Sequence, residues 1–114
     1  MVAGISSFST SEQDTGFTWT NGSKIYKKTV SCGALPSNSN TFTDLGVTNL
    51  GDIVKMEGIA HQPNINRYMP LPFASNGNWS VELSYTDNKI RIGTSNNYSA
   101  VTESYVTVYY TKTS

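Results

Sequence analysis

Short runs of alternating hydrophobic and polar residues fill most of the chain, and turn-forming residues separate them. From residue 17 onward, Gly, Pro, Asn or Asp interrupt the runs about every ten residues, which is the spacing expected of short strands. No long stretch carries hydrophobic residues at the 3.6-residue period of a helix. The pattern predicts an all-β domain, built as an antiparallel β-sandwich of about seven to eight strands.

The individual runs predict strands and assign their faces. In the run from 53 to 62, Val54 and Ala60 should share one face, because successive side chains in a strand alternate between faces. Gly58 in the same run should mark a bulge or a close backbone approach. The expected strands cover residues 25–32, 41–45, 53–62, 79–86, 89–93 and 104–112, with tight turns at 76–77 and 87–88.

Two segments depart from simple alternation. Residues 67–74 (RYMPLPFA) are apolar, but Pro70 and Pro72 supply no amide hydrogen to a ladder. This segment should therefore form an edge strand or extended coil. The last strand, residues 104–112, is aromatic or β-branched on both faces, which favours burial from two sides. We expect another copy of the chain to supply the second covering surface.

The length of 114 residues suits one domain with a single core. Residues 1–15 are small and polar with no sustained period, so they are expected to form a leader or the remnant of a stalk. The β-sandwich head domain is then expected to span residues 16–114. The N-terminal residues show neither the basic start nor the apolar run of a secretory signal, so we expect no export signal.

Composition predicts a neutral surface that is rich in hydrogen-bonding groups. Eight basic residues balance eight acidic ones, so no net field attracts nucleic acid or an anionic membrane. Only 14% of residues are charged, whereas Ser, Thr and Asn make up 40 of 114. Many extracellular β proteins and virion parts have surfaces of this kind. Seven Tyr, four Phe and two Trp residues argue against disorder.

Candidate chemistry is sparse. The single cysteine, Cys32, excludes an internal disulfide and a zinc site built on several thiolates, and we expect a buried, inert thiol. His61 is the only histidine, and no nucleophile motif accompanies it. Glu57 and Glu82 fall in separate strands as outward residues, which is poor support for glycoside hydrolysis. We expect a protein that is not an enzyme and has no metal or cofactor.

Two loops combine aromatic rings with amide side chains, as sugar-binding sites do. Aromatic faces stack on the apolar faces of sugar rings, while a few amide, guanidinium and hydroxyl groups bind the sugar hydroxyls. The segment at Arg67 and Tyr68 is a third candidate. The candidate ligand-binding residues of the two loops and a nearby strand are Asn76, Asn78, Trp79, Arg91, Asn96, Asn97 and Tyr98.

The order of features in residues 14–36 (DTGFTWTNGSKIYKKTVSCGALP) is distinctive. Trp19 precedes an Asn-Gly turn at residues 21–22, an alternating strand and a Gly-Ala-Leu-Pro exit. This order resembles the opening of a small β-rich module at the C-terminal ends of phage and prophage tail-fibre and receptor-binding proteins. The chain has Leu45 where that family often has a His, so no role of the His carries over. Further similarity follows at residues 45–54, 57–60, 70–72 and 110–112.

The resemblance implies a viral protein: a bacteriophage virion attachment module, at the tip of a tail fibre or receptor-binding protein. It would bind a bacterial cell-surface polysaccharide as a homotrimer, beside other virion proteins, after assembly in the host cytoplasm. Two alternatives stay open. One is a purely structural virion domain without a ligand, such as a head fibre, collar or trimerisation module. The other is a carbohydrate-binding module or small hydrolase of a secreted bacterial enzyme.

Overall fold

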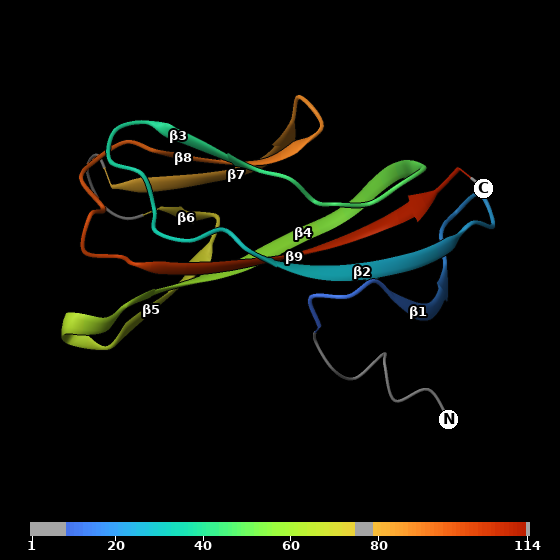
Figure 1. Ribbon diagram of the computed structural model, residues 1–114, viewed down its shortest axis with the longest axis horizontal. Helices are drawn as coiled ribbons and strands as arrows, with labels where there is room; N and C mark the ends of the chain where they lie inside the picture. The colour runs from blue at the N-terminus through green and yellow to red at the C-terminus, as the bar shows by residue number, and fades with distance from the viewer. Residues whose placement is uncertain (1–8, 75–78, 114) are drawn as a thin grey trace.

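Two β-sheets pack face to face in the computed structural model, which describes residues 9–74 and 79–113 (Figure 1). All strand pairs in these residues are antiparallel, so the predicted antiparallel β-sandwich is confirmed. The described strands are β1 (Gln13–Thr18), β2 (Lys24–Ser31), β3 (Asn40–Thr43), β4 (Leu50–Gln62), β5 (Arg67–Leu71), β6 (Phe73–Ala74), β7 (Ser80–Thr86), β8 (Lys89–Thr94) and β9 (Glu103–Lys112), with the 3-10 turn η2 (Pro63–Ile65) between β4 and β5.

The last strand of the chain lies at the centre of the larger sheet. That sheet has the order β1-β2-β9-β4-β5, and the smaller sheet has the order β3-β8-β7-β6. β9 pairs with β2 along one side and with β4 along the other, so its backbone is bonded on both sides. The C-terminal segment therefore joins strands that begin 24 and 50 residues into the chain.

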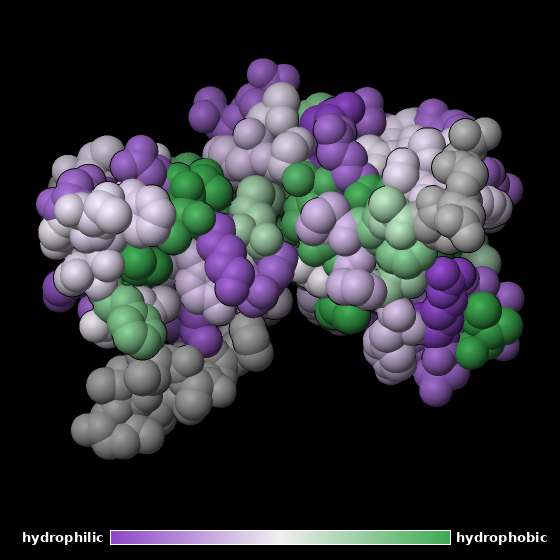
Figure 2. Space-filling view, turned by 180° about the vertical axis from the view of Figure 1, so that it is seen from behind, coloured by the Kyte–Doolittle hydropathy of each residue, from purple (hydrophilic) through white to green (hydrophobic). Residues whose placement is uncertain are grey.

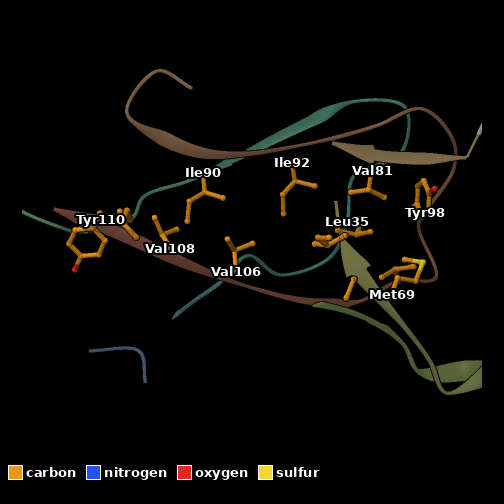
Figure 3. Packing of buried hydrophobic residues seen from close by; sticks show 13 residues of the cluster. Leu35, Met69, Val81, Ile90, Ile92, Tyr98, Val106, Val108 and Tyr110 are labelled. Carbon is orange, nitrogen blue, oxygen red and sulfur yellow. The ribbon is translucent and has the colours of Figure 1, made fainter. Parts of the chain in front are cut away.

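The core lies between the two sheets and follows the predicted alternation of β9. Val106, Val108 and Tyr110 are fully buried on its inner face. The inner face of β8 supplies Ile90 and Ile92 to the same cluster, as Figure 3 shows. Burial of such β-branched side chains between two sheets is the main stabilising contribution in a fold of this kind.

A bulge in β4 makes the predicted orientation of Val54 wrong. Ile53 pairs with Tyr110 and Lys55 pairs with Tyr109, which leaves Val54 as an extra residue. Val54 therefore lines a hollow on the outer face instead of sharing the core face with Ala60, which is buried. The alternation from 53 to 62 does not reveal this shift, because one inserted residue reverses the faces before it.

At Gly58 the backbones of β4 and β9 approach closely. This is one of the two alternatives predicted from the sequence, the other being a bulge. A Cβ atom at this position would lie 2.9 Å from the Tyr105 carbonyl oxygen and 3.2 Å from Val106 Cγ2. The backbone of β9 and the Val106 side chain both come close, so the absence of a side chain at Gly58 lets β4 and β9 pair closely here.

The segment from 67 to 74 occupies two sheet edges. β5 forms an edge of the larger sheet and β6 forms an edge of the smaller one, which confirms the edge position expected from its prolines. The division of this segment into two strands, together with β1, brings the described strands to nine rather than the expected seven or eight.

The expected domain boundary after residue 15 falls inside β1. Gln13 pairs with Lys27 and Asp14 pairs with Tyr26, so this part of the expected leader belongs to the larger sheet. The polar composition of these residues does not predict a strand, because an edge strand has one partner and needs few buried side chains. In the described part of the chain, no helix has the length and hydrophobicity needed to cross a membrane.

Candidate functional site

A cleft of about 390 Å³ opens at one end of the sandwich. Its volume is in the range of small-molecule sites, which measure roughly 300–1,000 Å³. Three parts of the described chain line it: the β4–β5 hairpin, Phe73 of β6 with Trp79 just before β7, and the β8–β9 loop. Its lining residues are Gln62, Ile65, Arg67, Phe73, Trp79, Asn97, Tyr98, Ala100 and Val101.

The β4–β5 hairpin directs two polar side chains to this cleft. Gln62 and Arg67 are the last cross-strand pair of β4 and β5, so their side chains share one face. The turn between them closes through a 3.1 Å hydrogen bond from the Asn66 amide to the Pro63 carbonyl. Asn66 takes the left-handed conformation (φ 49°), which asparagine tolerates better than most residues.

Trp79 and Tyr98 form an aromatic pair at the cleft. The two ring centroids are 5.2 Å apart and the planes meet at 85°, an edge-to-face contact. Tyr98 is only 5% exposed and belongs to the core, where Figure 3 places it at the opposite end of the row from Tyr110. Trp79 is 43% exposed. A rigid buried ring therefore supports a tryptophan that still presents open aromatic surface.

The Tyr98 hydroxyl is buried and has no hydrogen-bond partner among the described residues. Burial raises the pKa of this phenol above its ordinary value, and the nearby positive charge of Arg67 acts in the opposite direction. The phenol therefore stays protonated at neutral pH.

Arg67 and Phe73 stack at another side of the cleft. The guanidinium carbon lies 5.4 Å from the centre of the Phe73 ring, within the distance of a cation–π contact. The contact places the positive charge beside an aromatic ring, and the guanidinium carries five N–H donors.

The two asparagines of the β8–β9 loop have different roles. The Asn97 amide oxygen accepts hydrogen bonds of 2.9 Å from both the Ser37 hydroxyl and the Ser99 backbone N–H. Its amide nitrogen is the group left to donate to a ligand. Asn96 instead holds the loop, since its carbonyl accepts from the Asn38 amide and its side-chain oxygen accepts from the Asn97 amide.

Arg91 does not lie at the cleft, although it is close in sequence to this loop. It is on the outer face of the smaller sheet, where it forms an ion pair with Glu82 and donates a 3.0 Å hydrogen bond to Asn40 Oδ1. Ile90 and Ile92 on either side face the core, so strand alternation forces Arg91 outward.

Of the predicted ligand-binding residues, the structure brings Trp79, Asn97 and Tyr98 together at the cleft and leaves Arg91 and Asn96 out of its lining. Asn76 and Asn78 lie outside the described residues. Sequence reasoning missed Gln62, Ile65 and Phe73, and it singled out Arg67 only as part of a third segment. The pairing of Gln62 with Arg67 in the hairpin could have shown that these two residues lie side by side.

The remaining titratable groups lie apart from one another. Glu57 and Glu82 are on the outer faces of different sheets, so these two carboxylates cannot flank one glycosidic bond. Cys32 is half-buried, and burial raises the pKa of its thiol. Within residues 9–74 and 79–113, no three His, Cys, Asp or Glu side chains form a group that could hold a metal ion.

A second surface feature covers the outer face of the larger sheet. Ile59 of β4 pairs with Tyr105 of β9 and with Pro70 of β5, and both Ile59 and Tyr105 are more than two-fifths exposed. A groove of about 600 Å³ runs along this face. On the face of the molecule seen from behind in Figure 2, hydrophobic residues reach the surface in patches with hydrophilic ones between them.

Comparison of the chain with protein-family models, with curated proteins and with solved structures gives no match. The chemistry of the cleft is therefore the basis for a functional proposal.

Proposed function

We propose that this protein is a carbohydrate-binding module whose end cleft holds a sugar of a bacterial cell-surface polysaccharide. The single observation that carries the proposal is the exposed Trp79 ring, supported by buried Tyr98 and placed beside the polar groups of Asn97 and Arg67. An aromatic face of this kind accepts the apolar face of a sugar ring, and the polar groups nearby can bind its hydroxyls.

The biological setting we propose is the virion of a bacteriophage, with this domain at the tip of a tail fibre or receptor-binding protein. The resemblance of residues 14–36 to such modules supports this setting, as does the neutral surface rich in Ser, Thr and Asn. Attachment proteins carry several copies of each weak site. Repeated sites raise the overall avidity by orders of magnitude without a tight single site, about 10²–10⁴-fold.

Homotrimer formation is part of the proposal, and the outer face of the larger sheet supports it. Ile59 and Tyr105 form an exposed apolar pair on a sheet that is already packed on its inner face. A second copy of the chain is the occupant we propose for this face, because β9 carries large side chains on both faces. The same feature favours a second candidate function, a structural virion domain without a ligand.

The test of sugar binding compares two exposed aromatic residues. Trp79→Ala should weaken binding to host polysaccharide about thirtyfold or more, since central aromatic residues dominate binding sites. Phe42→Ala is the matched control: Phe42 is similarly exposed but lies on the outer face of the smaller sheet, and its loss should leave binding unchanged. Isothermal titration on glycans chosen from an array would measure both.

Equal loss of binding in the two variants, or no binding of any host glycan, would refute the carbohydrate proposal. Deletion of the domain from a phage then separates the two candidate functions. Intact particles that no longer adsorb to cells support attachment, whereas particles that fail to assemble support the structural role.

A further inference from the structure

We infer that the cleft is selective for an acidic sugar, with Arg67 as the counter-charge of an anionic oxygen group on the saccharide. This inference rests on the proposed carbohydrate function and adds the class of sugar. A uronic acid carboxylate and a sugar phosphate share the chemistry required, namely acceptor oxygens with negative charge that suit the fork of a guanidinium.

The charge balance of the cleft is the first argument. Among its described lining residues, Arg67 is the only charged one, and no carboxylate accompanies it. The described part of the chain offers Arg67 no ion-pair partner. An unneutralised cation in a concave site attracts an anion, because the low-dielectric walls reduce screening.

The acidic side chain that β9 places beside the β4–β5 hairpin is already engaged. Glu103 accepts a 2.7 Å hydrogen bond from His61 Nδ1. His61 pairs with Tyr68 across β4 and β5, one residue along from the Gln62–Arg67 pair, so its side chain is on the opposite face of the hairpin. Strand alternation thus separates the carboxylate from the cleft and leaves Arg67 on the other side.

The hydrogen-bonding groups around Arg67 favour a ligand that accepts. Arg67 makes a cation–π contact with Phe73, and its guanidinium carries five N–H donors. Asn97 uses its amide oxygen inside the loop, which leaves its amide nitrogen as a donor. Two groups of donors in a cleft without a carboxylate suit a sugar that carries acceptors, and a carboxylate or phosphate is the strongest acceptor a saccharide offers.

The test uses the whole chain and three probes: an oligosaccharide containing glucuronic acid, the same oligosaccharide after its carboxyl groups are reduced to alcohols, and a sugar phosphate. Titration calorimetry should show that reduction of the carboxyl groups weakens binding on the order of ten- to a hundredfold. Binding of the acidic probe should also weaken as sodium chloride is raised, since screening acts on the charge pair.

Variants assign the preference to one residue. Arg67→Gln should bind the acidic and the reduced probes equally, and Arg67→Lys should keep part of the preference, because it keeps the charge and loses the fork. Arg67 is exposed, so both variants should remain folded. Arg91→Gln is the matched control: it removes an arginine from the outer face of the smaller sheet and should leave the preference unchanged.

The outcomes separate this inference from the proposed function. Equal binding of acidic and reduced probes by the unaltered protein, or an unchanged preference in Arg67→Gln, overturns the inference while the carbohydrate proposal stands. No binding of any of the three probes overturns this inference, and the carbohydrate proposal falls with it only where the array of host glycans also shows no binding. Tighter binding of the sugar phosphate than of the uronate supports the inference and identifies phosphate as the anionic group.

Discussion

The phenol of Tyr110 donates a 2.6 Å hydrogen bond to the carboxylate of Glu12, a residue 98 positions earlier in the chain. Tyr110 is fully buried near the end of the central strand, and Glu12 directly precedes β1 at an edge of the same sheet. Lys112 adds a second contact, with its ammonium 3.1 Å from the other oxygen of Glu12. This contact joins the start and the end of the folded domain.

Loss of the Tyr110 hydroxyl should lower the free energy of unfolding. Tyr110→Phe keeps the ring but removes a hydrogen bond to a charged acceptor, which costs about 1.5–3 kcal/mol. Urea denaturation at pH 7 would measure the change. Asp14→Asn is the control, because its ion pair with Lys24 is exposed and contributes at most about 1 kcal/mol. Equal effects of the two substitutions would contradict the structural role of Tyr110.

Acid should weaken the same contact. Burial acts to raise the pKa of Glu12, but the hydrogen bonds from Tyr110 and Lys112 outweigh it and hold the pKa below the ordinary value. A carboxyl group whose pKa is lowered by folding stabilises the protein above its unfolded pKa, and this contribution is lost as the pH falls through the folded value. The stability difference between the natural protein and Glu12→Gln should therefore be largest at neutral pH and shrink below about pH 4.

His61 should titrate above the ordinary value for histidine. The hydrogen bond to Glu103 is the main cause of its raised pKa; partial burial opposes it, and Asn66 adds a smaller contribution. Its ring also stacks on Tyr68, with centroids 4.2 Å apart. The stabilisation is complete below the unfolded pKa of about 6.5 and is lost as the pH rises through the higher folded value.

Proton NMR can follow this titration directly, because His61 is the only histidine. Glu103→Gln should bring its pKa back toward 6.5, the ordinary value. Lys89→Gln alters an exposed charge at the start of β8, in the smaller sheet, and should leave the titration unchanged. A His61 pKa that is the same with and without Glu103 would contradict the proposed cause.

A side chain at Gly58 should destabilise the larger sheet. In Gly58→Ala, the added methyl group meets the Tyr105 carbonyl oxygen at 2.9 Å, so the β4–β9 pairing must open slightly. Overpacking of this kind costs about 1–3 kcal/mol. Gly22→Asn is the comparison: Gly22 has open space around it and a positive φ that asparagine tolerates, so thermal unfolding should show a smaller loss.

Removal of the Tyr98 hydroxyl should not destabilise the protein. The group is buried without a partner among the described residues, and an unpaired buried hydroxyl costs about 1–3 kcal/mol. Tyr98→Phe should therefore unfold at the same or a higher temperature, which calorimetry would detect. A clear fall in the unfolding temperature would show that the hydroxyl is paired in solution.

The strands were largely predictable because alternation is a local property. The inner face of β9 follows directly from the spacing of its hydrophobic residues, and the edge position of residues 67–74 follows from the missing amide hydrogens of Pro70 and Pro72. Val54 escaped prediction because the bulge in β4 depends on its register with β9. The polar residues of β1 escaped it because an edge strand needs little buried area.

The candidate site was predictable only in part. An aromatic residue beside amides drew attention to Trp79, Asn97 and Tyr98, and the structure brings them to one cleft. Arg91 seemed a neighbour because it is near in sequence, but the alternation of β8 turns it to the outer face. The hairpin that carries Gln62 and Arg67 joins the cleft through a cross-strand pairing that the sequence analysis did not use.

The amino-acid sequence by itself determined the all-β class, the faces of most strands and the types of polar and aromatic group that a ligand could meet. Those properties depend on neighbouring residues and on the two-residue period of a strand. Only the tertiary structure decided the order of the strands, the place of Glu12 beside Tyr110 and the cation at the cleft. These features arise from pairings between distant segments, which are fixed when both sheets bury their apolar faces against each other.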